Sequence, residues 1–155
     1  MTKPQPSAAL VREAEYAYHR LACLYARAMD SHLPELLDQI LSGDVVIAGP
    51  AFTLEGLQNA RQTPAQLREM FLKTQHLVHN QTLTLVDETR AEGETYCTAS
   101  HILRPAAGTA QHAALVWAIR YQDELRREAG EWRLARRALI VDWSETRPIA
   151  LDTRG

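Results

Sequence analysis

The second half of the chain contains four long segments of strand-like composition, separated by short polar or glycine-containing breaks. The segments are His76–Asp87, Glu94–Arg104, Gln111–Leu125 and Glu131–Trp143. Breaks of this length are typical of hairpins, so neighbouring segments are expected to pair in antiparallel fashion. The sequence before them is mainly helical in pattern. Helices followed by hairpins predict an α+β domain.

The N-terminal half predicts three helices and two short strands. Apolar residues recur at spacings of three and four between Ala14 and Ala28, which indicates one buried helical face. The expected helices run over Ser7–Asp30, Glu35–Leu41 with an end at Gly43, and Pro64–Lys73. The expected short strands are Asp44–Ala48 and Ala51–Leu54.

The length of 155 residues predicts one domain, with loose tails at about 1–6 and 145–155. A curved sheet packed against the helices would leave a cavity between the two layers. The net charge of −2 argues against a general nucleic-acid binder, which would carry an excess of basic residues. The sequence shows neither a long apolar run nor a signal-peptide core, so we expect a cytoplasmic protein that does not bind membranes. Cys23 and Cys97 are expected to be free thiols.

Two residues outside the helical core are candidates for acid–base chemistry. Asp30 lies at the expected C-terminal end of the first helix, where the helix dipole disfavours a carboxylate unless it has a partner such as histidine. A solvated turn residue is the alternative. His101 alternates with Cys97 and Ala99 on an apolar strand face, as either a core histidine or a catalytic one.

His76 and His79 are three residues apart on an expected strand, so they should point to opposite faces of the sheet. The alternation does not decide which of them faces the cavity. The sequence contains no HExxH, CxxC, GxGxxG or GxSxG motif, and we therefore expect neither a metal ion nor an organic cofactor. The arginines between Arg126 and Arg137 alternate with acidic residues, which predicts a solvated hairpin with ion pairs.

Four stretches carry a resemblance to a known family: LYARAMDSH, TQHLVHN, YQDELRREAGEWRLARR and the closing pair Asp142–Trp143. With these features in this order, the chain resembles the SnoaL-like family of the NTF2-like superfamily from about Leu10 to Trp143. The resemblance implies a cone in which three N-terminal helices pack on a strongly curved antiparallel sheet and enclose a pocket.

Within this family the chain is most similar to scytalone dehydratase and to the bile-acid 7α-dehydratase type. Asp30, His76 and His101 match the Asp and the two His of the fungal dehydratase, and this match selects His76 over His79. Tyr25 with Asp30 matches the Tyr-x4-Asp spacing of the bile-acid type. Met29 stands where the fungal enzyme has a Tyr, and the VVIAGP stretch lacks a second Tyr, so we expect a different substrate.

The resemblance implies a cofactor-independent lyase that acts on a small, cyclic, carbonyl-containing substrate. His76 would remove a proton next to the carbonyl, Asp30 would hold its ring, and Tyr25 would donate a hydrogen bond to the carbonyl oxygen. Either His101 or His76 would protonate the leaving hydroxyl. An isomerase with the same dyad and a non-catalytic small-molecule-binding or assembly module are the alternatives. The family also implies a homodimer or homotrimer.

Overall fold

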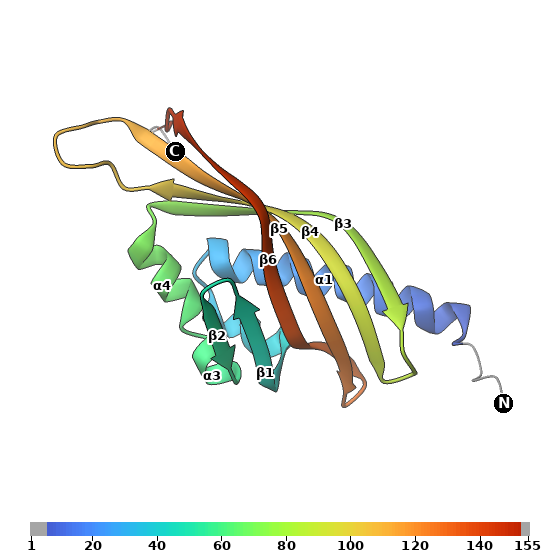
Figure 1. The fold of residues 1–155 in the computed structure, drawn as a ribbon. Helices are drawn as coiled ribbons and strands as arrows, with labels where there is room; N and C mark the ends of the chain where they lie inside the picture. Colours follow the sequence, from blue (N-terminus) through green and yellow to red (C-terminus); the bar gives the residue numbers. More distant parts are fainter. Residues whose placement is uncertain (1–5, 153–155) are drawn as a thin grey trace.

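The computed structural model describes residues 6–152, in which one long helix and several short ones pack on a six-stranded sheet (Figure 1). The helices are α1 (Ala8–Asp30), the 3-10 turn η1 (Pro34–Leu36), α2 (Leu37–Ile40), α3 (Leu57–Ala60) and α4 (Thr63–Met70). The strands are β1 (Leu41–Gly49), β2 (Phe52–Glu55), β3 (Lys73–Leu85), β4 (Arg90–Leu103), β5 (His112–Glu128) and β6 (Glu131–Ile149).

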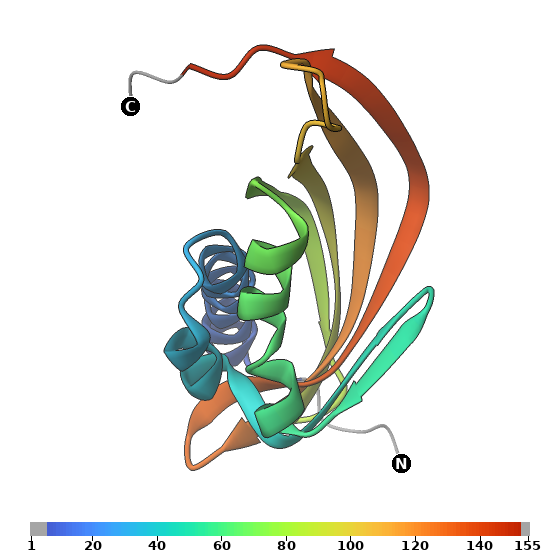
Figure 2. The ribbon, with the colours of Figure 1, turned by 90° about the vertical axis from the view of Figure 1, so that its left-hand side faces the viewer.

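The sheet has the order β2-β1-β6-β5-β4-β3. Its neighbouring strands are antiparallel except for β1 and β6, which are parallel. The predicted α+β cone is confirmed, because the sheet bends around α1 and α4 (Figure 2). The sheet is mixed, however, because β1, which precedes the hairpins in the chain, pairs in parallel with β6, the last strand of the hairpin series.

Helix α1 forms as its sequence pattern predicts. The Ser7 side chain accepts a hydrogen bond from the backbone N–H of Leu10 at 3.2 Å and caps the first turn. Tyr18, Tyr25 and Met29 belong to the buried face of the helix, which packs on β3. The last residue of α1 is Asp30, so the same helix that forms the core also positions this carboxylate.

The predicted ends of the second and third helices differ from the structure. The second helix ends at Ile40, and Gly43 lies inside β1, because the chain becomes extended from Leu41 onward. The third helix ends at Met70, and Lys73 is already the first residue of β3.

The predicted C-terminal tail is wrong for residues 145–149, which belong to β6. Ser144–Ile149 pair with the first residues of β5, from His112 to Trp117. Backbone pairing does not require apolar side chains, and this polar stretch therefore lacks the alternating pattern from which a strand is predicted. Residues 1–5 and 153–155 of the predicted tails lie outside the described residues.

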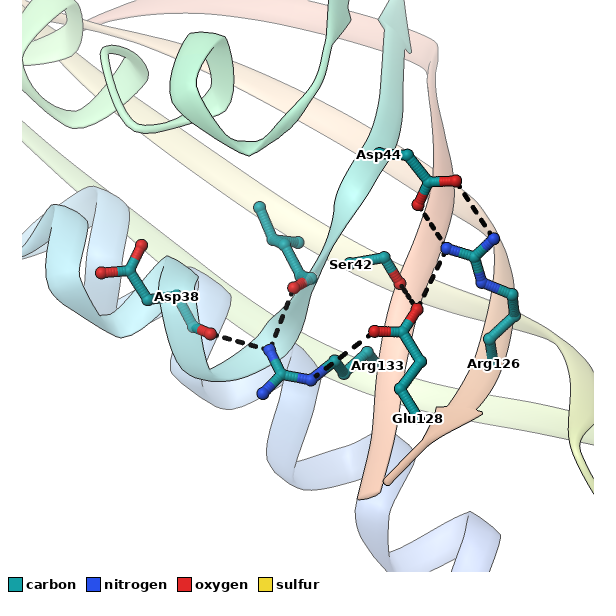
Figure 3. Close-up of polar contacts among 7 residues, drawn as sticks. Asp38, Ser42, Asp44, Arg126, Glu128 and Arg133 are labelled. Atoms are coloured by element: carbon teal, nitrogen blue, oxygen red, sulfur yellow. Dashed lines mark hydrogen bonds and ion pairs between the residues drawn. The ribbon is translucent and has the colours of Figure 1, made fainter. Parts of the chain in front are cut away.

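A polar cluster attaches β1 to the β5–β6 hairpin where backbone pairing between β1 and β6 is interrupted, between Leu41 and Val46 (Figure 3). The buried Ser42 hydroxyl donates to Glu128 at 2.7 Å. Arg126 forms ion pairs with both Glu128 and Asp44. Arg133 donates to the carbonyl oxygens of Asp38 at 2.7 Å and Leu41 at 3.1 Å. These side chains therefore connect β1 to β5 and β6 where the backbone pairing is interrupted.

Candidate active site

Asp30 and His76 form a hydrogen-bonded pair where the end of α1 meets the start of β3. The Oδ1 atom of Asp30 accepts from His76 Nδ1 at 2.7 Å and from the Thr74 hydroxyl at 2.9 Å. The Oδ2 atom accepts from the backbone N–H of His76 at 2.7 Å. The expected contact is therefore present. Because an ionised carboxylate only accepts, the Nδ1 atom carries a proton, and in the uncharged form of the ring the lone pair is on Nε2.

The surroundings of Asp30 keep it ionised. Partial burial opposes its ionisation, but the hydrogen bonds from His76 and Thr74 outweigh this and hold the pKa of Asp30 below its ordinary value. An ionised carboxylate fixes the orientation of the imidazole. It also stabilises the imidazolium that forms when His76 takes up a proton.

A cavity of about 430 Å³ lies between α1, α4, β2 and the inner face of the sheet. Its walls are formed by Tyr25, Met29, Phe52, Leu54, Thr63, Gln66, Leu67, Met70, Phe71, His76, His101, Trp117, Ile119, Tyr121 and Leu139. None of these described wall residues is an Asp, Glu, Lys or Arg. A neutral, mainly apolar ligand of the size of one or two rings suits such a cavity.

His101 is both a buried residue and a wall residue of the cavity, so the two sequence alternatives coincide. Its Nδ1 atom lies 3.3 Å from the carbonyl oxygen of Leu115, which can only accept. The ring packs between Phe71 and Trp117, with centroid separations of 4.6 and 4.9 Å. Its centroid is 6.0 Å from that of His76. The Nε2 atom of His101 is thus a second hydrogen-bond acceptor near His76.

The pKa of His101 is lowered below its ordinary value of 6.5, mainly by burial and secondly by the neighbouring His76. The unfolded chain therefore binds a proton at this residue more readily than the folded protein does. We expect the free energy of unfolding to fall as the pH drops below about 6.5 towards the lowered pKa. Urea titrations between pH 7 and 5 should show a shallower dependence for His101→Gln, because the other histidines cancel in the comparison. Identical pH dependence would contradict the burial of an uncharged His101.

His79 lies on the opposite face of the sheet from His76, as strand alternation predicted, and it points away from the cavity. Its Nε2 atom lies 2.8 Å from the hydroxyl of Thr98, and the side chain is exposed. The register shift of β3 falls after Val78, so His76 remains on the inner face and His79 on the outer face.

Behind two residues of the cavity wall, Tyr25 and Tyr121, lies a charged pair that was predicted to be solvated. Arg137 is fully buried and donates from Nε and Nη2 to the two carboxylate oxygens of Asp123, each at 2.8 Å. The Tyr18 hydroxyl also donates to Asp123 at 2.7 Å. The prediction of a solvated hairpin is thus wrong for this pair. The available signal was the position of Asp123, which alternates with Tyr121 on an otherwise apolar strand face.

Tyr25 lies in the cavity wall, as the resemblance implied, and is accompanied by Tyr121, which sequence reasoning missed. The two rings meet edge to face at a centroid distance of 6.0 Å. Arg137 Cζ lies 4.4 Å from the Tyr25 ring centroid and 4.1 Å from that of Tyr121. Four candidate residues from the sequence therefore share one cavity region: Asp30 behind its wall, and Tyr25, His76 and His101 in it.

Other features of the described chain bear on the site. Cys23 is exposed and Cys97 is buried, and neither forms a disulfide, so the expectation of free thiols is confirmed. Within residues 6–152, no group of three or more His, Cys, Asp or Glu side chains is placed to hold a metal ion. None of the helices in that range is both long and apolar enough to cross a membrane. A second hollow of about 430 Å³, between Glu92 and Arg136 on the outer sheet face, contains no imidazole.

Comparisons with known proteins agree with this architecture. The chain is similar in fold to a provisionally assigned scytalone dehydratase from Novosphingobium aromaticivorans, with a TM-score of 0.77, 20% identity and 94% of each chain covered. It is also similar to a hexachlorocyclohexane dehydrochlorinase, LinA type 2, with a TM-score of 0.79, 19% identity, and 93% of this chain and 94% of that chain covered. A third similar structure is LinA type 3 from Novosphingobium barchaimii, with a TM-score of 0.78, 17% identity, and 93% of this chain and 95% of that chain covered.

At these identities the structural likeness concerns the fold alone. No curated protein matches the sequence. The SnoaL-like domain, by contrast, matches residues 11–138, which is most of the chain. With this match, the chain belongs to the SnoaL-like domain family.

Proposed function

We propose that this protein is a cofactor-independent lyase of the dehydratase type. The observation that supports this most is the His76–Asp30 pair in the wall of an uncharged, largely apolar cavity. The carboxylate holds the Nδ1 proton, and the free Nε2 lone pair can act as a general base. The fold is shared with a provisionally assigned scytalone dehydratase and with dehydrochlorinases, which is consistent with an elimination reaction.

In the proposed reaction, His76 Nε2 removes a proton from the carbon next to a carbonyl group of the substrate. The electron pair of the broken C–H bond forms an enolate, whose oxygen accepts a hydrogen bond from Tyr25. The enolate then reforms the carbonyl and expels a hydroxyl from the next carbon. The His76 imidazolium gives its proton to this hydroxyl, which leaves as water. The products are an unsaturated carbonyl compound, water and the original enzyme.

In this scheme His101 does not act as the general acid. Because burial lowers the pKa of His101, the ring is uncharged at neutral pH and has no proton on Nε2 to give. We assign it the role of accepting a hydrogen bond from the substrate hydroxyl, which holds the leaving group near His76. Of the two proton donors considered from the sequence, His76 is therefore preferred.

The cavity favours a small cyclic hydroxy-carbonyl compound as substrate. About 430 Å³ accommodates one or two rings, and Phe71, Trp117 and Tyr121 offer flat apolar surfaces. The absence of charged side chains among the described wall residues disfavours ionic substrates, because an unpaired charge is costly to bury.

The experiment is incubation with cyclic 3-hydroxy ketones of one and two rings, followed by mass spectrometry in ordinary and heavy water. A dehydratase yields a product lighter by one water. An isomerase with the same dyad yields a product of unchanged mass that has gained deuterium in heavy water. A binding module gives saturable binding without either change, and that result would reject the lyase.

We also propose that the chain forms a homodimer or homotrimer through the outer face of the sheet. Leu77, Thr98, Ala118 and Trp143 form one row across β3 to β6, and Leu77 and Trp143 are 47% and 59% exposed. The helices lie on the other face, so a second copy is a suitable cover for this row (Figure 2). Sedimentation should show a dimer or trimer that Trp143→Glu dissociates. A monomeric wild type at micromolar concentration would contradict the proposal.

A further inference from the structure

The side of α4 that lines the cavity changes from polar to apolar along the helix. Its wall residues, Thr63, Gln66, Leu67 and Met70, are spaced at three and four positions and therefore lie on one face of α4. A helix that packed only on a core would carry apolar side chains at all four positions. The two positions nearer the start of α4 are polar instead, and among residues 63–70 only Pro64 is buried. This face is thus suited to a ligand with a polar end.

The polar groups of Thr63 and Gln66 are open to a ligand. Thr63 is partly buried and Gln66 is exposed. No other described residue forms a hydrogen bond with the Thr63 hydroxyl or with the Gln66 amide group. The wall residues contributed by β2 and β6, which are Phe52, Leu54 and Leu139, are apolar and offer no partner. A hydroxyl and a primary amide both donate and accept, so the two side chains suit a ligand group that does the same, such as a hydroxyl.

The other end of α4 lies beside His101. Phe71 follows Met70, the last residue of α4, and its ring centroid is 4.6 Å from that of His101. With a rise of about 1.5 Å per residue, Gln66 is displaced from Met70 by about 6 Å along the helix axis, and Thr63 by about 10 Å. A ligand that meets His101 with one oxygen therefore needs a second oxygen at its far end to reach Gln66 or Thr63.

We propose that Thr63 and Gln66 form a specificity subsite for a second hydroxyl of the substrate, remote from the carbons that react. The inference deepens the proposed function, on which it rests for the identity of the reacting end. The group at the subsite is uncharged, because no described wall residue could neutralise a carboxylate or an ammonium group. The preferred substrate is thus apolar in its middle and carries an oxygen function at each end.

The subsite is tested with two ketones that cannot lose water, 2-acetylnaphthalene and its 6-hydroxy derivative. Calorimetric titration should show that the wild-type protein binds the hydroxy ketone about fivefold more tightly, as one or two additional hydrogen bonds provide. Gln66→Leu and Thr63→Val should each remove most of this preference and leave the affinity for the parent ketone unchanged. Thr63→Ser keeps the hydroxyl and should retain the preference.

The matched control is Gln62→Leu. Gln62 precedes the first residue of α4, is exposed and does not belong to the cavity wall, so both affinities should remain at their wild-type values. Circular dichroism establishes that each variant is folded. Equal wild-type affinity for the two ketones would overturn the subsite. Loss of both ligands to the same extent in Gln66→Leu would also overturn it, because it would show an effect on cavity shape alone.

Turnover separates this inference from the proposed function. With hydroxy ketones that differ only in a distal hydroxyl, Gln66→Leu should raise the KM of the hydroxylated substrate about fivefold and leave kcat near the wild-type value. A protein that discriminates between the two naphthyl ketones but eliminates no water would retain the subsite and reject the lyase. A lyase that shows no discrimination in either assay would retain the reaction and reject the subsite.

Discussion

Replacement of His76 by glutamine is expected to lower kcat for elimination by a factor of at least about 10³. Glutamine is of similar size and can still donate a hydrogen bond to Asp30, which accepts from His76 Nδ1 at 2.7 Å. It has no basic lone pair to remove the proton, however. The KM should change little, because the apolar walls of the cavity supply most of the ground-state binding. Initial rates with a hydroxy ketone accepted by the wild type measure both constants.

The matched control is His79→Gln, on the same strand but on the outer face of the sheet, where His79 contacts Thr98. This variant should retain the wild-type rate. The kcat of Asp30→Asn should lie between those of His76→Gln and His79→Gln, because the base remains but its tautomer and orientation are no longer fixed. A His76→Gln protein with more than about one-tenth of the wild-type kcat would show that another group is the base.

The second large effect concerns stability. Arg137→Met is expected to lower the free energy of unfolding by about 3–5 kcal/mol, because it leaves the Asp123 carboxylate buried without its cation. Combination with Asp123→Asn should recover most of this loss, since the amide can still accept the hydrogen bond from Tyr18. Urea unfolding, monitored by circular dichroism, gives the free energy of unfolding of the wild type, of Arg137→Met and of the double variant.

The neighbouring residue provides the control. Arg136 and Glu124 form an ion pair at 3.8 Å in which both side chains are more than half exposed. Arg136→Met should therefore cost less than about 1 kcal/mol. Equal losses for Arg136→Met and Arg137→Met would mean that the Arg137–Asp123 pair is not buried in solution.

The sequence predicts the helical half of the site well. Helix α1 ends at Asp30 as its apolar spacing and capping indicate, and an isolated carboxylate at a helix C-terminus indicates a partner. Strand alternation separates His76 from His79 but cannot say which side faces the helices. Only the family resemblance selected His76, because the choice of face depends on packing between elements distant in the sequence.

The buried Arg137 could not be predicted because a bulge changes the alternation of β6. Leu134 pairs with Leu125 and Arg136 pairs with Glu124, so Ala135 is an extra residue in the ladder. In a regular strand without the bulge, Arg136 would share the inner face with Leu134, and Arg137 would point outside. A bulge follows from the curvature of the whole sheet and leaves no local pattern.

The parallel contact between β1 and β6 has a consequence for synthesis of the chain. Leu41 lies beside Leu134, so β1 leaves the ribosome long before its partner strand exists. At about 5–20 residues per second, the interval is roughly 5–20 s. During this time the apolar side chains of Val45 and Ile47, which are buried in the finished protein, have no sheet to cover them. We therefore expect the nascent chain to depend on chaperones at this stage, and to acquire its ligand-binding capacity only after β6 has been made.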